Sequence, residues 1–325
     1  MKKVAVVGFG NIATRHRRNL RFLFPNARIF GMSASGRSIP ELPSDCDEVV
    51  TSIEELAKNN VEMAIIASPA PFHSRQAIQF IRAKIPVLIE KPVTTSVDDG
   101  EQLLQEVKRY KTPVAVGYCL RYLSSASEVK QRIEKEELGK IYNAFIEIGQ
   151  YLPDWRPNKD YRGCVSARKE LGGGALFELS HEIDYCQWLL GPLTLKFAEQ
   201  RSVGDLGIDV EDCVDIIATS KQSTLVTIHL DFLQRKAYRR CRLIGEKGVL
   251  EWDLINNELI KVTPETREVL YSSRNWDKNQ MYINMLLDFV SLINGQACNA
   301  VSLKESLQTV RFIEAVKANY PLESN

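Results

Sequence analysis

The sequence predicts two domains of different class. We expect a doubly wound α/β domain with a parallel sheet over residues 1–120, and an α+β domain with an open, mostly antiparallel sheet over residues 121–325. The 325 residues exceed what one hydrophobic core usually supports. Short apolar runs alternate with helical patterns up to about residue 118, which is typical of a parallel sheet covered on both faces. Longer alternating runs after residue 140 indicate an antiparallel sheet.

In the first domain, the strands and helices follow from hydrophobic periodicity. Continuous apolar runs predict buried strands, and inward residues spaced three and four apart predict helices. The expected strands are 4–7, 27–32, 63–67, 87–89 and 114–116, and the expected helices are 53–58, 72–84 and 97–110. In the second domain we expect strands at 142–152, 224–232 and 239–244, a turn at 245–248, and helices at 174–190, 280–293 and 303–318.

The composition is that of a globular protein, and it excludes several classes of partner. Hydrophobic residues make up 44% and charged residues 26%, with a formal net charge of +1. This balance favours neither nucleic acid nor a membrane surface, and no apolar run reaches the length of a membrane span. The seven cysteines are scattered without a Cys-x-x-Cys pair, so we expect no metal site, no disulfide framework and a reducing cytoplasmic setting.

The first strand ends in the sequence Gly-Phe-Gly-Asn-Ile-Ala, and a helical pattern follows at once. Gly8 allows a sharp turn, Gly10 leaves no Cβ between the backbone and a phosphate, and Ala13 is small enough for close packing of helix on strand. The amides at the start of the helix would bind the pyrophosphate. The motif predicts a Rossmann-type dinucleotide site, although a structural turn is the alternative. The expected cofactor contacts are Gly8, Phe9, Gly10, Asn11 and Ile12.

The end of the second strand should meet the adenosine ribose. An acidic residue usually accepts the ribose 2′-hydroxyl of NAD at this place, but residues 31–37 contain none. Ser33 and Arg37 suit a 2′-phosphate better, because a guanidinium binds phosphate through two hydrogen bonds. The residues therefore favour NADP over NAD, with an ordinary solvated loop as the alternative.

Two further strand ends carry candidate cofactor contacts at the ligand-binding edge of the sheet. Ser68 and Pro69 precede a helix that begins near His73, which could contact the cofactor or serve as a structural hydrogen-bond partner. Glu90 and Lys91 directly follow a buried strand, where charges are costly unless they are paired or used. Lys91 could handle a proton, and the alternative is a salt-bridged strand end.

These motifs occur in the order found in the Gfo/Idh/MocA family of NAD(P)-dependent sugar and polyol oxidoreductases, which the chain resembles. The matching pieces are 8–16, Ser68-Pro69 with His73, Glu90-Lys91-Pro92, 117–122 and 172–184. The resemblance implies an active site at the junction of the two domains and a sheet face that forms the subunit contact of a homodimer or homotetramer.

The resemblance also implies that Lys91 and His181 carry the reaction. His181 and Asp184 are three residues apart and share a helix face. Where many relatives have an aspartate four residues before the histidine, this chain has Phe177, and Glu178 follows it. On one continuous helix, Glu178 could pair with His181 at i, i+3.

The polar loop 151–170 carries aromatic and cationic side chains that suit a sugar ring and an anionic group. We therefore expect a sugar substrate, acidic or nucleotide-linked; contact with a partner subunit is the alternative role of the loop. The expected substrate contacts are Arg121, Trp155, Arg156, Tyr161, Glu178 and Asp184. The expected reaction is hydride transfer between NAD(P) and a secondary alcohol carbon, and the alternatives are an epimerase or lyase that recycles its cofactor and a sensor without turnover.

Overall fold

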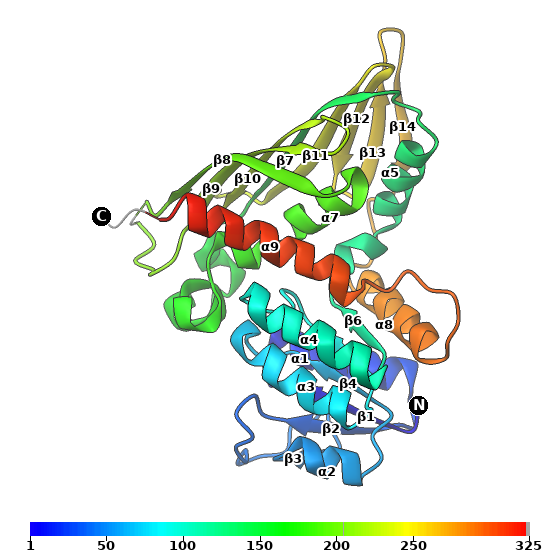
Figure 1. Ribbon diagram of the computed structural model, residues 1–325, viewed down its shortest axis with the longest axis vertical. Coiled ribbons are helices and arrows are strands. Elements are labelled where there is room, and N and C mark those ends of the chain that lie inside the picture. Colours follow the sequence, from blue (N-terminus) through cyan, green and yellow to red (C-terminus); the bar gives the residue numbers. More distant parts are fainter. Residues whose placement is uncertain (204, 323–325) are drawn as a thin grey trace. The chain divides into compact units, whose positions relative to one another are not determined.

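The computed structural model describes residues 1–203 and 205–322, and the chain forms two compact units (Figure 1). The first unit comprises residues 1–118 and 279–310, and the second comprises residues 119–278 and the segment from Arg311 onward. The last helix, α9 (Leu303–Asn319), begins in the first unit and ends in the second. In the described part of the chain, every helix is too short or too polar to cross a lipid bilayer.

The first unit contains the predicted parallel sheet, in the order β3-β2-β1-β4-β5-β6. The order reverses at β1, so the carboxyl ends of β1 and β4 form the switch point where ligands bind in such sheets. The strands are β1 (Lys3–Val7), β2 (Arg28–Met32), β3 (Glu48–Val50), β4 (Met63–Ile66), β5 (Val87–Ile89) and β6 (Val114–Val116).

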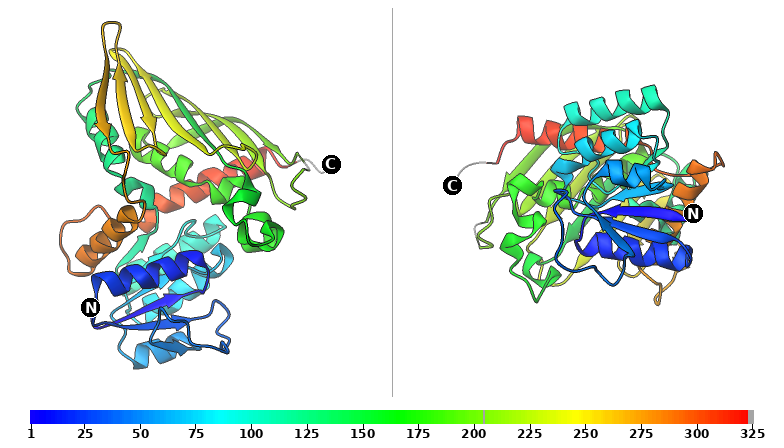
Figure 2. Two further views of the ribbon diagram at one scale, coloured as in Figure 1. Left: turned by 180° about the vertical axis from the view of Figure 1, so that it is seen from behind. Right: turned by 90° about the horizontal axis from the view of Figure 1, so that it is seen from below.

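Helices cover both faces of this sheet, as the near-continuous burial of its strands requires. The helices α2, α3, α4 and the first part of α9 share one core with the sheet, whereas α1 and α8 pack together on the other face (Figure 2). The helices are α1 (Asn11–Leu23), α2 (Ile53–Lys58), α3 (His73–Arg82), α4 (Val97–Tyr110) and α8 (Gln280–Ile293).

The second unit is built on an eight-stranded sheet, in the order β14-β13-β12-β11-β7-β10-β9-β8. Its pairs are antiparallel except for β7 with β10, which confirms a mostly antiparallel sheet. The strands are β7 (Ile141–Gly149), β8 (Leu193–Arg201), β9 (Cys213–Ser220), β10 (Leu225–Asp231), β11 (Tyr238–Gly245), β12 (Gly248–Asp253), β13 (Glu258–Val262) and β14 (Arg267–Ser272).

The helices α5 (Ser124–Glu134), α6 (Ala175–Glu178) and α7 (His181–Leu190) pack on one face of this sheet (Figure 1). The other face, called the outer face below, carries partly exposed side chains that alternate with the buried ones along the central strands β7, β9, β10 and β11. Its large apolar side chains include Phe145, Phe197, Ile217 and Leu225.

The prediction of one helix over residues 174–190 is wrong. Between α6 and α7, the amides of Ser180 and Glu182 bond to the carbonyl oxygens of Phe177 and Leu179, three residues back rather than four. This tighter turn ends α6 and begins α7 in a new direction. Glu178 and His181 therefore lie on different helices, and the argument for an i, i+3 pair on one helix no longer applies.

Candidate active site

The glycine turn has the geometry that the sequence predicted. Gly8 has a φ of 114°, and a Cβ there would lie 2.5 Å from the carbonyl oxygen of Ala67, so the turn requires glycine. Gly10 caps α1 in an extended conformation. Among the described residues beyond its chain neighbours, no heavy atom lies within 4 Å of the place of a Cβ on Gly10. The site therefore leaves room for a pyrophosphate beside the first amides of α1.

Arg17, which sequence reasoning missed, holds this turn. Its buried guanidinium donates from Nη1 to the carbonyl oxygen of Gly8 (2.9 Å) and from Nη2 to Thr14 Oγ1 (3.1 Å). Its Nε donates to Asp45 Oδ1 (2.8 Å) and completes an ion pair. The face of the Phe9 ring also lies over the guanidinium, 5.1 Å from centroid to Cζ. A charged residue four positions after Ala13, on the buried face of the helix, was the signal in the sequence.

The end of β2 presents the two residues expected near the adenosine ribose. Ser33 is buried, and its Oγ has no hydrogen-bond partner within the described chain. Arg37 is exposed, and among the described residues none forms a hydrogen bond or ion pair with it. A buried hydroxyl with unused bonding capacity and an exposed cation suit a polar ligand at this edge.

At the end of β5, Glu90 is held by a neighbour from another element. Its Oε1 lies 2.6 Å from Nε2 of the buried His16 on α1, and its Oε2 accepts from the Lys91 amide at 3.2 Å. A Cβ on Gly117 would lie 3.0 Å from Glu90 Oε2, so the end of β6 leaves the space that this carboxylate fills. Glu90 thus orients the start of the segment that carries the half-buried Lys91.

His73 is buried and serves the protein as a hydrogen-bond partner. Its Nδ1 lies 2.9 Å from the carbonyl oxygen of Pro92, and its Nε2 lies 2.8 Å from that of Ser68. Burial lowers the pKa of the imidazole, although the hydrogen bonds to these carbonyl groups oppose the shift. His73 therefore joins the strand ends β4 and β5, and a direct contact with the cofactor stays a prediction.

In the second unit, the glycine run 172–174 brings the chain close to buried backbone. A Cβ on Gly173 would lie 2.3 Å from the carbonyl oxygen of Val165, and one on Gly174 would lie 2.4 Å from Glu211 Oε1. The Glu211 carboxylate accepts from the Leu176 amide at 3.2 Å and so satisfies a donor at the start of α6. Burial raises the pKa of Glu211, opposed by Lys317. Close packing therefore requires glycine at Gly173 and Gly174, in addition to the match of this run to the family motif.

Two bidentate ion pairs fix α7, the helix that begins at His181. Arg121 donates from Nε and Nη2 to the two carboxylate oxygens of Asp184 at 2.9 and 2.7 Å. Arg239 donates in the same way to Glu182 at 2.6 and 2.8 Å. All four side chains are largely or fully buried. The predicted substrate residues Arg121 and Asp184 therefore bind each other, and they orient the turn of α7 next to His181.

Three other predicted substrate residues, Glu178, Trp155 and Tyr161, contact residues of the second unit. Glu178 Oε2 accepts from Ser166 Oγ at 2.8 Å. Trp155 packs edge-on against Phe232, and its buried Nε1 has no partner in the part of the chain that the structure describes. The Tyr161 hydroxyl donates to the carbonyl oxygen of Leu206 at 2.9 Å. An open depression of about 560 Å³ is lined by Pro153, Pro157, Asn158, Lys159, Asp160, Tyr161 and Arg162.

Lys91 belongs to the first unit and His181 to the second, and their convergence stays a prediction. Within each unit, however, the residues of the predicted motifs lie together. The first unit joins the glycine turn, Glu90 and His73 at one edge of its sheet, and the second joins the glycine run, α6 and α7.

The comparisons with known proteins cover both units. A model of an oxidoreductase family with an NAD-binding Rossmann fold matches residues 2–118, and a model of the Gfo/Idh/MocA C-terminal domain matches residues 126–251. The inositol 2-dehydrogenase of Rubrobacter xylanophilus is 24% identical over 271 residues, which cover 79% of this chain and 73% of the relative.

Solved structures share the fold at low sequence identity. A levoglucosan dehydrogenase in complex with NADH and L-sorbose has a TM-score of 0.84 at 17% identity, over 98% of this chain and 96% of that one. The WlbA dehydrogenase from Bordetella pertussis, in complex with NADH and UDP-GlcNAcA, has a TM-score of 0.79 at 18% identity, over 98% and 94%. With both family models matched in sequence order, this protein belongs to the Gfo/Idh/MocA family of NAD-dependent oxidoreductases.

Proposed function

We propose that the protein is a dehydrogenase that transfers hydride reversibly between NAD(P) and a secondary alcohol carbon of a sugar or sugar derivative. The observation that carries the proposal is the open space at Gly10 beside the first amides of α1, at the sheet edge from which Lys91 extends. The bound nicotinamide supplies the hydride acceptor or donor. Names of relatives such as inositol 2-dehydrogenase support a polyol or sugar as the substrate class.

In this proposal, His181 takes the hydroxyl proton when the alcohol is oxidised, because imidazole titrates near neutral pH. Lys91 donates a hydrogen bond to the same oxygen and stabilises the negative charge that develops there. The ion pair of Arg121 with Asp184 holds the helix of His181, and Glu90 orients the segment of Lys91. These two supports would position the acid–base pair rather than take part in proton transfer.

We further propose that NADP is the preferred cofactor. The support is the exposed guanidinium of Arg37, a group that suits a 2′-phosphate, together with the absence of an acid from residues 31–37. Arg37→Gln should weaken NADPH binding at least tenfold and leave NADH binding unchanged. Arg109→Gln, an exposed arginine on α4, is the matched control. Tighter binding of NADH than of NADPH by the unaltered protein would contradict this preference.

The acidic or nucleotide-linked character of the substrate stays part of the proposal. Its support is the set of aromatic and basic side chains in 151–170, including Trp155, Arg156 and Tyr161. We also propose a homodimer or homotetramer that buries the apolar side chains of the outer face, such as Phe145 and Ile217, in a cytoplasmic setting. Light scattering on the purified protein measures the assembly.

The test of the function is a panel of sugars and polyols with NADH and NADPH, followed by absorbance of the reduced cofactor. A steady change in absorbance identifies a dehydrogenase, and deuterium-labelled cofactor then locates the reacting carbon. Product without a net change identifies an epimerase or lyase, and neither signal identifies a sensor. Lys91→Met should abolish turnover and keep cofactor binding, whereas Lys108→Met, at an exposed lysine on α4, should keep both turnover and cofactor binding. Retained turnover in Lys91→Met would contradict the role of Lys91.

A further inference from the structure

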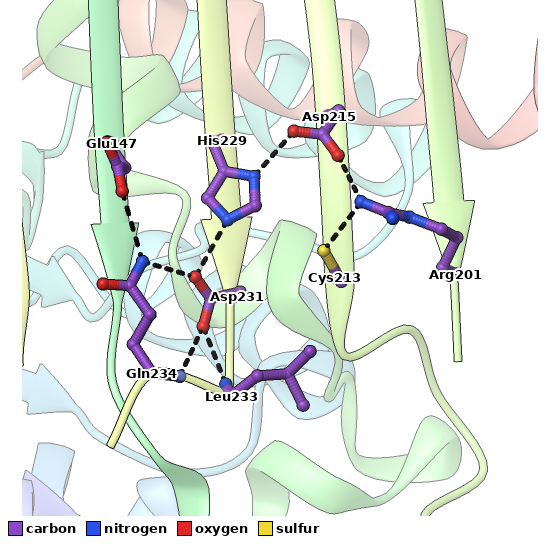
Figure 3. Close-up of polar contacts among 8 residues, drawn as sticks. All are labelled: Glu147, Arg201, Cys213, Asp215, His229, Asp231, Leu233 and Gln234. Carbon is purple, nitrogen blue, oxygen red and sulfur yellow. Dashed lines mark hydrogen bonds and ion pairs between the residues drawn. The ribbon is translucent and has the colours of Figure 1, made fainter. Parts of the chain in front are cut away.

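Two neighbouring rows of the second unit's sheet gather polar side chains on its outer face. Strand register sets each row, because residues opposite one another on adjacent strands point to the same side. One row contains Gly149, Asp231, Cys213 and Arg201, and the next contains Glu147, His229 and Asp215. We call Cys213, Asp215, His229, Asp231 and Arg201 the outer-face cluster (Figure 3).

Three members of the cluster bring together the donor atoms that transition metals prefer. The Cys213 sulfur, an Asp215 carboxylate oxygen and a His229 ring nitrogen all lie within 4.8 Å of one another. Tetrahedral coordination of Zn²⁺ at bonds of about 2.0–2.3 Å needs ligand atoms roughly 3.5 Å apart, so shifts of about 1 Å would close the site. A thiolate and a carboxylate would together balance the charge of a divalent ion. Sulfur and imidazole ligands favour Zn²⁺ or Co²⁺ over Mg²⁺ or Ca²⁺.

The buried Asp231 contacts the ring nitrogen of His229 that does not face Asp215. His229 Nδ1 lies 2.6 Å from Asp215 Oδ1, whereas Nε2 lies 2.9 Å from Asp231 Oδ2. Asp231 also accepts hydrogen bonds from the Leu233 amide, and from the amide and the Nε2 of Gln234. A carboxylate that binds the second nitrogen of a histidine, and so fixes the ring, is the usual support of a metal ligand.

Gly149, in the same row, leaves the space that the Asp231 carboxylate occupies. A Cβ on Gly149 would lie 2.3 Å from Asp231 Oδ2 and 2.3 Å from Gln234 Nε2. Any larger residue at Gly149 would displace the carboxylate that orients His229. The arrangement of Asp231 and His229 therefore requires glycine at this position.

A cation already lies between two of the donors. The Arg201 guanidinium contacts Cys213 Sγ at 3.1 Å and also forms an ion pair with Asp215. Its side chain is half-exposed within a single copy of the chain, so its departure would leave the core of that copy intact. The gap between sulfur and carboxylate thus accepts positive charge, and Arg201 competes for that place.

From this geometry we propose that the outer-face cluster is a binding site for one zinc-like divalent ion. Cys213, Asp215 and Nδ1 of His229 are the ligands, Asp231 is the positioning residue, and the fourth coordination place is left for water. The site joins β9 to β10. The site is separate from the proposed dehydrogenase reaction, because its ligands lie on the outer face of the sheet, which the proposed homodimer or homotetramer would bury, whereas α7 packs on the other face.

Protons on two of the ligands oppose the binding of a metal ion and lower the expected affinity. Burial raises the pKa of the Cys213 thiol to about 11. The hydrogen bond to Asp231, opposed by burial and aided by Asp215, raises the pKa of His229 to about 9. The ion must displace these protons and the guanidinium, so we expect weaker binding than in a four-ligand structural zinc site.

The experiment is a titration of the full chain, freed of metal by a chelator, with Co²⁺ alone. We expect one Co²⁺ per chain, a near-ultraviolet thiolate-to-cobalt absorption band, and displacement by Zn²⁺. Cys213→Ser should remove the band and weaken binding at least tenfold. Cys298→Ser, a half-buried cysteine outside the cluster, is the matched control and should change neither.

Two further variants test the arrangement in opposite directions. Asp231→Asn should weaken binding about 10- to 100-fold and keep the thiolate band, because the carboxylate supports His229 without binding the ion. Arg201→Gln should tighten binding by removal of the competing cation, and the exposure of this side chain makes loss of folding unexpected. A band that persists in Cys213→Ser, or uptake that never saturates at one ion per chain, would overturn the proposal, as would weaker binding in Arg201→Gln.

Discussion

Arg17 Nη1 donates a 2.9 Å hydrogen bond to the carbonyl oxygen of Gly8, so a buried cation fixes the turn on which the nucleotide site is built. Arg17→Gln removes the charge that pairs with Asp45, and breaking a buried ion pair costs about 3 kcal/mol. We expect a lower melting temperature and weaker NADH and NADPH binding, because the turn and the first amides of α1 lose their support. Calorimetry and a binding titration measure the two effects.

Arg18→Gln is the control for this prediction, because Arg18 is the exposed neighbour on the same helix. It should leave both measurements unchanged. Equal cofactor affinity in Arg17→Gln and the unaltered protein would show that the turn keeps its shape without the guanidinium.

The two glycines of the turn should separate folding from binding. Gly8→Ala places a Cβ 2.5 Å from the carbonyl oxygen of Ala67 at a φ of 114°, so it should destabilise the first unit. Gly10→Ala meets open space at an ordinary extended conformation, so its melting temperature should hold. The added methyl group would nevertheless occupy the room left for the pyrophosphate, and cofactor affinity should fall at least tenfold. Thermal unfolding measures the stability of each variant, and cofactor titration measures its affinity. Full cofactor affinity in Gly10→Ala would mean that the phosphates bind elsewhere.

Much of the first unit could be predicted from the sequence, because its strands are continuous apolar runs and its helices have clear inward faces. The helices Ile53–Lys58 and Val97–Tyr110 and the strand Val114–Val116 have the expected bounds. Side-chain caps explain why the two helices begin at these residues, since Ser52 and Ser96 each accept a hydrogen bond from an amide three residues later.

The second unit was harder to predict, for physical reasons. The strand Leu193–Arg201 has a register shift between Leu195 and Phe197, which breaks the alternation of buried and exposed residues. The helix Ser124–Glu134 is weakly amphipathic and has no side-chain cap at its start. The break between α6 and α7 depends on hydrogen bonds three residues apart, which periodicity does not encode.

The supports of the candidate site depend on contacts between distant segments. Arg121 was expected to bind substrate, yet its partner Asp184 lies 63 residues away in the sequence. The outer-face cluster likewise depends on strand register, so the spacing of the cysteines could not reveal it.

The ion pair of Arg121 with Asp184 should stabilise the second unit. Asp184→Asn keeps the shape of the side chain but removes the charge, and loss of a partner in a buried pair costs about 3 kcal/mol. The double variant Arg121→Met with Asp184→Leu should be less destabilised than the sum of the single variants Arg121→Met and Asp184→Leu, because neither charge is then buried. Urea unfolding of the four proteins measures the coupling. Asp154→Asn, at an exposed carboxylate, is the control, and strict additivity would mean that the two residues act separately.

Finally, His73 should make stability depend on pH. Both of its ring nitrogens lie within 2.9 Å of carbonyl oxygens. In the folded protein, burial holds the pKa of the His73 imidazole below the ordinary value of 6.5. As the pH falls below 6.5, the unfolded chain binds a proton that the folded chain resists, so this group lowers the free energy of unfolding. The melting temperature should therefore drop between pH 7.5 and 5.5 by more in the unaltered protein than in His73→Gln. The other three histidines are present in both proteins, so the difference between the two slopes isolates His73. Parallel slopes would mean that the folded protein takes up the proton without cost, with the imidazolium donating to both carbonyl groups at once.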